Sequence, residues 1–113
     1  MADTEESYKV VFTTLGSRED ALSLVRLLVA DRLVACGTIL ENAVSIYEWQ
    51  GELEETPEVF VIMKTRTDLW DRLQSVVHEL HPYEVPELLA IPITEGLPAY
   101  LGWLAEQTTQ EQQ

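Results

Sequence analysis

The chain has 113 residues, seven Lys plus Arg against twenty Asp plus Glu, and a formal net charge of −13. One hydrophobic core commonly occupies roughly 100–150 residues, so this length predicts a single domain. A negative charge of this size repels phosphate backbones, which argues against nucleic acid as a partner. The hydrophobic content of 46% is sufficient for a packed core.

The cysteine content and the N-terminal sequence favour a reducing compartment. Cys36 is the single cysteine, which excludes an intrachain disulfide and a Cys-x-x-Cys zinc or redox motif. The first seven residues are acidic, unlike a secretory or transit peptide, and no run of eighteen apolar residues occurs. We therefore expect a cytoplasmic protein without membrane insertion.

The first part of the chain predicts a strand followed by a helix. Residues 8–15 contain a compact β-branched and aromatic run, which predicts a strand that ends at Gly16. Ser17 has the position of a helix N-cap, and the helix is expected to end near residues 31–32. Its apolar stripe, which should face a sheet, consists of Leu22, Val25, Leu28 and Val29.

A long hairpin is expected next. Residues 35–49 favour a strand, and Gln50-Gly51 favours a tight turn because glycine adopts a positive φ without strain. The returning strand is acidic over 52–58 and fully apolar over 59–63. Continuous apolarity predicts a central strand that is covered on both faces.

The remaining elements are a helix, a strand and a short terminal helix. Thr67 and Asp68 open the second helix, which Pro82 ends. A strand is expected at 88–91, and Pro98 begins a short amphipathic helix. The apolar stripe of the second helix consists of Leu69, Leu73, Val76, Val77 and Leu80. We expect a disordered segment at 1–7, one domain at 8–105 and a disordered polar tail at 106–113.

This order of elements is the ferredoxin-like split β-α-β pattern of the α+β class. It places two helices on one face of an antiparallel sheet, with the short C-terminal helix outside that pattern. The other sheet face is then left open, and an apolar face needs a cover. We expect neighbouring subunits to supply it, with the hairpin that ends at Trp49 as a strand-pairing interface.

Five segments resemble the CutA divalent-cation tolerance family in their order and spacing, over about residues 8–105. The segments are Ala30–Cys36, Ser45–Gly51, Lys64–Thr65, His81–Glu87 and Tyr100–Leu104. The combination of His-Pro-Tyr-x-x-Pro-Glu with Ala-Cys and Tyr-x-Trp-x-Gly is specific. The resemblance implies a ferredoxin-like subunit in a tight homotrimer, similar in architecture to the PII signalling proteins, with strands of neighbouring subunits paired.

The resemblance also implies a role in tolerance to divalent cations, copper above all. Animal members of the family are associated with anchoring of acetylcholinesterase. In some bacterial members copper ligands are proposed from a cysteine in the first strand and a His-His pair before Pro-Tyr. Thr13 and Leu80 stand at two of these positions here, and His81 alone matches.

Two residues are metal-ligand candidates. His81 lies at a helix exit, where its ring can bind a terminal carbonyl or ligate a metal. Cys36 is a soft ligand for copper(I) when deprotonated, or a packed strand residue. One imidazole with carboxylates such as Glu84 predicts weak binding of copper or another divalent cation. No contact or oxyanion site supports a Cys36–His81 catalytic pair, so we predict neither an enzyme nor an organic cofactor.

Lys64 follows a buried apolar run, where its charge needs a carboxylate or a ligand anion. One interpretation is an ion pair between subunits, for which the carboxylate candidates are Glu58, Glu84 and Glu87. The other is a cleft between subunits that holds a small ligand. Its candidate residues, together with Cys36, are Trp49, Lys64, Tyr83, Glu84 and Glu87.

The leading functional hypothesis is a homotrimeric, non-enzymatic binding protein in the response to divalent metal ions. A second hypothesis is a PII-like signalling module with small-molecule clefts between subunits. A third is a stable structural trimer that anchors a partner protein. The absence of a G-x-G-x-x-G or Walker-type loop disfavours nucleotides in the second hypothesis.

Overall fold

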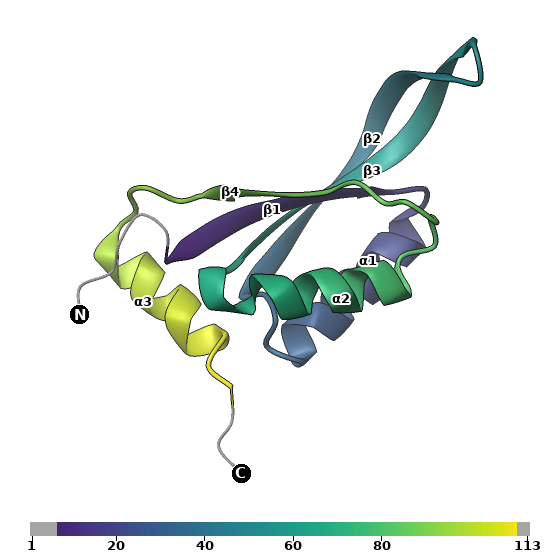
Figure 1. Ribbon diagram of the computed structural model, residues 1–113. Helices are drawn as coiled ribbons and strands as arrows, with labels where there is room; N and C mark the ends of the chain where they lie inside the picture. Colours follow the sequence, from purple (N-terminus) through teal and green to yellow (C-terminus); the bar gives the residue numbers. More distant parts are fainter. Residues whose placement is uncertain (1–6, 111–113) are drawn as a thin grey trace.

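The computed structural model describes residues 7–110. The elements in chain order are β1 (Tyr8–Leu15), α1 (Arg18–Ala30), β2 (Cys36–Trp49), β3 (Glu52–Arg66), α2 (Trp70–Leu80), β4 (Leu88–Pro92) and α3 (Pro98–Gln107), as Figure 1 shows. A single 3-10 turn, Thr67–Leu69, precedes α2. Of the N-terminal segment 1–7, which we expected to be disordered, all but Ser7 lies outside the described residues.

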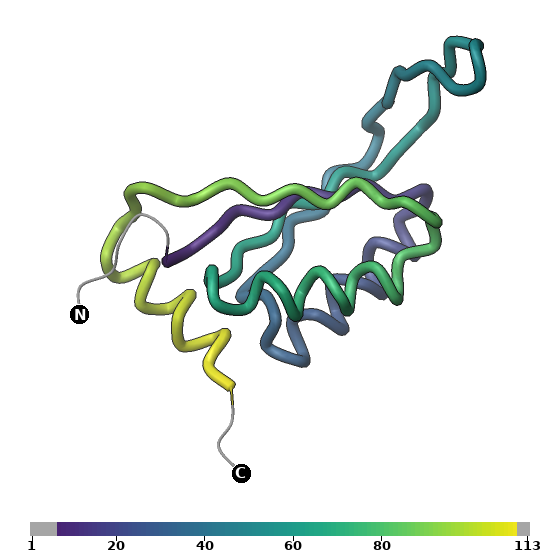
Figure 2. Tube along the Cα trace, viewed as in Figure 1, coloured from purple at the N-terminus to yellow at the C-terminus, as the bar shows by residue number. Residues whose placement is uncertain are grey.

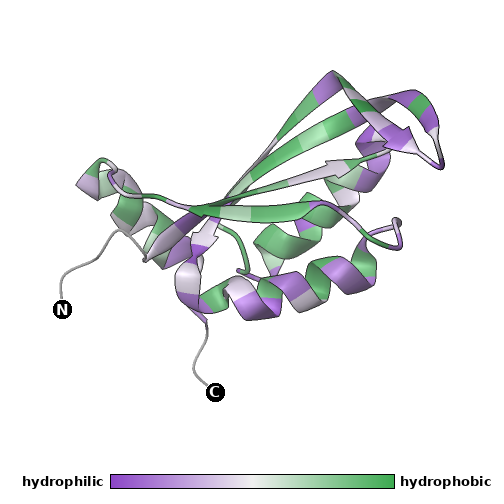
Figure 3. Cartoon of the chain, turned by 45° about the horizontal axis from the view of Figure 1, so that its top comes forward, coloured by the Kyte–Doolittle hydropathy of each residue, from purple (hydrophilic) through white to green (hydrophobic). Residues whose placement is uncertain are grey.

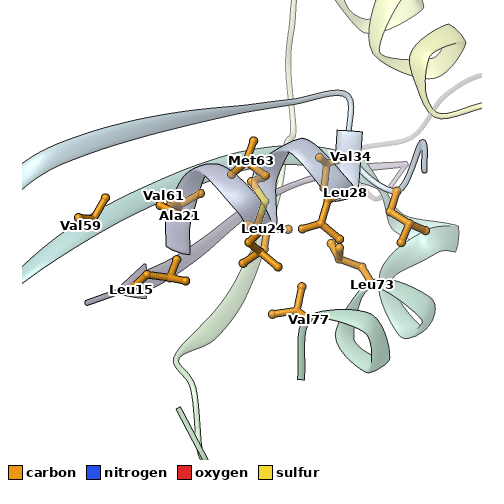
Figure 4. Close-up of a cluster of buried hydrophobic side chains, with 13 residues drawn as sticks. Leu15, Ala21, Leu24, Leu28, Val34, Val59, Val61, Met63, Leu73 and Val77 are labelled. Atoms are coloured by element: carbon orange, nitrogen blue, oxygen red, sulfur yellow. The ribbon is translucent and has the colours of Figure 1, made fainter. Parts of the chain in front are cut away.

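The four strands form one antiparallel sheet in the order β2-β3-β1-β4. The trace in Figure 2 shows α1 and α2 side by side along this sheet. Their buried side chains join those of β1 and β3 in one cluster, which Figure 4 shows in close-up. This arrangement confirms an α+β domain with two helices on one face. Among the described residues, no helix has both the length and the apolar composition that a membrane span requires.

Helix α1 buries a face that differs from the predicted stripe, whereas in α2 only Leu80 of the predicted stripe is exposed. In α1, Ala21 and Leu24 are buried with Val25 and Leu28, whereas Val29 is exposed. Leu22 is half-buried. The broad apolar composition of α1 allowed more than one stripe, and the small Ala21 lets the helix approach the sheet closely. The predicted N-cap is confirmed, since the Ser17 hydroxyl accepts a hydrogen bond from the Asp20 backbone N–H at 3.1 Å.

Of the segment 106–113, which we expected to be a disordered tail, the structure describes residues 106–110, and residues 111–113 lie outside the described part of the chain. Helix α3 continues to Gln107, and the buried Thr108 hydroxyl donates to the Leu104 carbonyl at 2.9 Å. The Gln110 side-chain amide then donates to the carbonyl of Arg32 at 2.9 Å. Arg32 has a φ of 61°, and its carbonyl follows α1. The C-terminal residues are therefore held because they cap backbone groups at the end of another helix.

The face opposite α1 and α2, which we call the open face, carries exposed apolar residues. Figure 3 shows how much of the sheet is hydrophobic. Val61 and Met63 of β3 are fully buried under the helices, while Phe60 and Ile62, which point the other way, are only half-buried. The prediction that this strand is covered on both faces is thus wrong for the single chain. Helix α3 covers only one end of the open face, where the Tyr100 hydroxyl lies 3.6 Å from the Cys36 sulfur.

The distal part of the β2–β3 hairpin, residues 43–58, projects beyond the other strands (Figure 1). We call it the arm. Its turn at Gln50 and Gly51 has φ values of 53° and 83°, which confirms the predicted tight turn. A β-bulge between Leu40 and Ala43 was not predicted, and Asn42 within it has a φ of 68°. Asparagine tolerates this left-handed conformation better than most residues.

Candidate functional site

His81 lies at the exit of α2, buried against the end of β1. Its Nδ1 accepts a hydrogen bond from the Tyr83 backbone N–H at 3.1 Å. Its Nε2 is 2.8 Å from the carbonyl oxygen of Thr14. Because a carbonyl can only accept and a backbone N–H can only donate, Nε2 is the donor of this ring and Nδ1 is its acceptor. A metal ion could reach either nitrogen only after one of these bonds had broken.

The loop after α2 also contacts the base of the arm through Tyr83 and Glu58. The Tyr83 hydroxyl donates to one Glu58 carboxylate oxygen at 2.6 Å, and the Ser45 hydroxyl donates to the other at 2.8 Å. Burial raises the pKa of Tyr83 to about 12, with further contributions from the hydrogen bond to Glu58 and from its negative charge. These contacts connect three segments that are distant in the sequence.

A hollow of about 970 Å³ lies between this loop and the arm. Four of the predicted cleft residues line it, namely Trp49, Tyr83, Glu84 and Glu87. The other lining residues are Ser45, Ile46, Tyr47, Glu54, Thr56, Glu58 and Val85. We call this site the acidic hollow, because it contains four glutamates and no Lys, Arg or His among its lining residues. Its electrostatics favour a cation over an anion.

Lys64, the fifth predicted cleft residue, lies elsewhere. It is paired in register with Cys36 on one side and Val10 on the other, within the open face. Residues 58 and 64 are six positions apart along β3, a separation of about 20 Å in an extended strand. Within the described part of the chain, no ion pair joins Lys64 to Glu58, Glu84 or Glu87. A single copy therefore brings four of the five predicted cleft residues together and leaves Lys64 apart.

Comparison with known proteins places this arrangement in a family. A sequence model described as "CutA1 divalent ion tolerance protein" matches residues 9–107. The chain belongs to this CutA1 family. The "Divalent-cation tolerance protein CutA" of Thermus thermophilus is 45% identical over 100 residues, which cover 88% of this chain and 97% of the relative.

Further relatives extend the family beyond bacteria and to solved structures. "Protein CutA" of Homo sapiens is 37% identical over 102 residues, 90% of this chain and 57% of that protein. The crystal structure of CutA from Xylella fastidiosa has a TM-score of 0.89 at 36% identity, covering 91% of this chain and 99% of that one. The fold described above is thus the fold of CutA1 proteins.

The positions that the resemblance assigns to copper ligands hold a different arrangement in this CutA1 chain. The buried Thr13 hydroxyl donates to the Glu87 backbone carbonyl at 2.7 Å, and Leu80 is an exposed apolar residue. Within residues 7–110, no group of three or more His, Cys, Asp or Glu side chains is placed to hold a metal ion.

His81 and Cys36 do not form a common site. His81 contacts Thr14 near the end of β1, whereas Cys36 lies opposite Lys64, which pairs with Val10 near the beginning of that strand. The Cys36 thiol is half-exposed beside Tyr100, and burial, together with this thiol contact, raises the pKa of Tyr100. Of the two predicted ligands, Cys36 is the one that need not first give up a buried hydrogen bond.

Sequence reasoning missed most of the arm's contribution to the acidic hollow. Glu58 was considered only as a partner for Lys64, and Glu54 and Thr56 were not considered as site residues. Their alternation along β3 with Glu52 was the available signal, since residues two apart share a strand face. That signal was not sufficient, because the β-bulge at Asn42 decides which residues of β2 lie beside them.

Proposed function

We propose that this CutA1 chain is a non-enzymatic binding protein of the divalent-cation response and that it acts in the cytoplasm as a homotrimer of ferredoxin-like subunits. Membership of the divalent ion tolerance family over residues 9–107 is the observation that carries the proposal. The sheet order β2-β3-β1-β4, with every neighbour antiparallel, supports the ferredoxin-like assignment.

The open face supports the assembly. It exposes Leu40, Leu89 and Ile91, which are 46%, 59% and 52% accessible in one copy. Burial of apolar surface contributes roughly 25 cal/mol per Å², so a face of this kind favours association. The hairpin arm offers two strands whose outer edges can pair with another chain.

Weak cation binding is the expected molecular event. The acidic hollow supplies carboxylates such as Glu84 and Glu87, and Cys36 supplies a soft donor for copper(I). His81 remains a predicted ligand, but its use requires the loss of a hydrogen bond to Thr14 or Tyr83. Such a loss costs roughly 1–3 kcal/mol for a buried group, which is consistent with low affinity.

Two measurements test the proposal. Native mass spectrometry should show three copies of the 12.8 kDa chain, and elemental analysis should find a divalent metal or copper in untagged protein that was purified without chelator. A monomer at micromolar concentration would refute the assembly. A metal-free protein that also gives no heat in copper titrations would refute cation binding.

Variants then assign the site. Calorimetric titration with copper(II) compares the wild type with His81→Ala, and His78→Ala is the matched control because His78 is exposed on α2. Titration with copper(I) compares the wild type with Cys36→Ser. If both affinities are unchanged, the carboxylates of the acidic hollow become the ligands, which Glu84→Gln tests.

A small-molecule function is the second candidate. The volume of the acidic hollow and the aromatic side chains of Tyr47, Trp49 and Tyr83 around it favour this alternative. A thermal-shift screen of metabolites, with cationic compounds included, separates it from the leading proposal, since a ligand that binds the native state raises the melting temperature.

A further inference from the structure

Lys64 is a charged residue whose nearest neighbours on the open face are uncharged. Its register partners across the sheet are Cys36 and Val10, and Ile62 precedes it on the same face. Arg66, the next residue on this face, has Asp68 within 3.2 Å, whereas Lys64 has no ion pair among the described residues. An ammonium group that loses water without gaining a counter-charge is strongly destabilising. Covering the open face therefore requires a carboxylate from outside this copy.

The arm is the segment that is best suited to supply this carboxylate. Residues 43–58 contain five glutamates and no Lys, Arg or Asp, so every charged side chain on the arm is negative. Two arms that meet each other would repel. An arm that meets the Lys64 region of another copy would be attracted. Contacts between two different surfaces are heterologous, and they generate rings when the rotation closes, as in a trimer, rather than twofold dimers.

The β-bulge at Asn42 determines which arm residues are available. Directly paired residues share a face, so Cys36, opposite Lys64, lies on the open face, as does Leu40, opposite Phe60. Without the bulge, this alternation would continue through Val44 and Ile46. The extra residue of the bulge shifts this alternation by one position. Ser45 and Tyr47 therefore lie on the open face instead, opposite Thr56 and Glu54.

The glutamates of the arm are thereby divided between two faces. Glu52, opposite Trp49, and Glu54 lie on the open face, which is continuous from the body of the sheet to the tip of the arm. Glu48 and Glu55 lie on the other face. Glu58 is also on the open face but is already held by Ser45 and Tyr83.

We propose that Glu52 and Glu54 of one copy provide the counter-charge for Lys64 of the next copy, so that each interface joins an acidic arm to a basic position. Lys64 cannot use its own arm, because Glu52 lies twelve positions away along β3, about 40 Å in an extended strand. This inference rests on the proposed homotrimer and specifies which surfaces meet within it.

Sedimentation velocity of four variants tests the pairing. Lys64→Met and the double variant Glu52→Gln/Glu54→Gln should each raise the concentration at which the assembly dissociates by about tenfold or more, since each leaves an interfacial charge unpaired. Lys9→Met and Glu48→Gln/Glu55→Gln are matched controls with the same charge changes on the other face, and they should assemble like the wild type. Circular dichroism checks that each subunit remains folded.

A charge exchange gives the decisive comparison. Lys64→Glu alone should dissociate, and the chain that combines it with Glu52→Lys and Glu54→Lys should assemble again. The pairing would be overturned if Glu52→Gln/Glu54→Gln and Glu48→Gln/Glu55→Gln weakened the assembly equally, or if the charge exchange did not restore the assembly. In either case a trimeric wild type would leave the proposed function intact. A monomeric wild type would overturn both.

Discussion

The β2–β3 hairpin has two parts with the same backbone pairing and opposite surroundings. In the body, where β3 also pairs with β1 over residues 59–66, Val61 and Met63 are fully buried beneath α1 and α2. In the arm, Leu53 is 73% exposed and Trp49 is 61% exposed. A two-stranded ribbon is marginal in water by itself. Hydrogen bonding continues across both parts, so side-chain cover is what distinguishes a stable sheet from a segment that needs a partner.

The largest expected effect is a loss of subunit stability when the core beneath the body of the sheet is changed. Leu28→Ala removes a fully buried side chain of α1 and should lower the free energy of unfolding by about 2–5 kcal/mol. Leu53→Ala, the same change in the arm, should leave the stability of the subunit nearly unchanged. Urea unfolding at several protein concentrations separates the subunit contribution from that of assembly. Equal losses in both variants would mean that the arm is packed as tightly as the core.

A smaller effect is expected when the arm loses its terminal aromatic residue. Trp49→Ala should weaken the assembly by about 2 kcal/mol or more, because an aromatic side chain buried at an interface commonly contributes that much. The subunit fold should persist, since Trp49 belongs to neither of the two clusters of buried hydrophobic side chains. Sedimentation velocity measures the first effect and circular dichroism the second. An unchanged sedimentation profile would exclude Trp49 from the interface.

The smallest effect concerns the junction between the two parts. The folded-state pKa of Tyr83 is about 12, above its ordinary value of 10.0, so folding favours the neutral phenol. The stability that this group contributes is complete below pH 10 and is lost as the pH rises from 10 to 12. A spectrophotometric titration of the wild type should contain one tyrosine ionisation near pH 12 that Tyr83→Phe lacks. If the missing ionisation is near pH 10, the phenol does not donate to Glu58 in solution.

The elements were predictable because their signals are local. Ser17 caps α1 as expected, the turn at Gln50 and Gly51 has the positive φ values that its residues favour, and Pro82 follows directly after α2 and its C-cap. Hydrophobic periodicity was a less reliable predictor of which helix residues are buried. In α1, the predicted Val29 is exposed and Ala21 is buried instead, because several apolar stripes are compatible with one amphipathic sequence.

The predicted cleft between subunits stays a prediction. In one copy Trp49, Tyr83, Glu84 and Glu87 line one hollow, whereas Lys64 lies on another part of the sheet. The register of β3 settled this separation. His81 was predicted both as a helix-exit residue and as a metal ligand, and its hydrogen bonds to Thr14 and Tyr83 became visible only in three dimensions.

The sequence by itself determined the order of the elements, the acidic arm without a basic residue and the family. These properties depend on residue identity, chain spacing and local backbone preference. The tertiary structure decided which side chains of the arm lie on the open face, because Asn42 adds one residue to β2 and side chains alternate with a period of two. It also decided that Lys64 lies on the open face without a carboxylate partner among the described residues, since strand register sets which distant side chains meet.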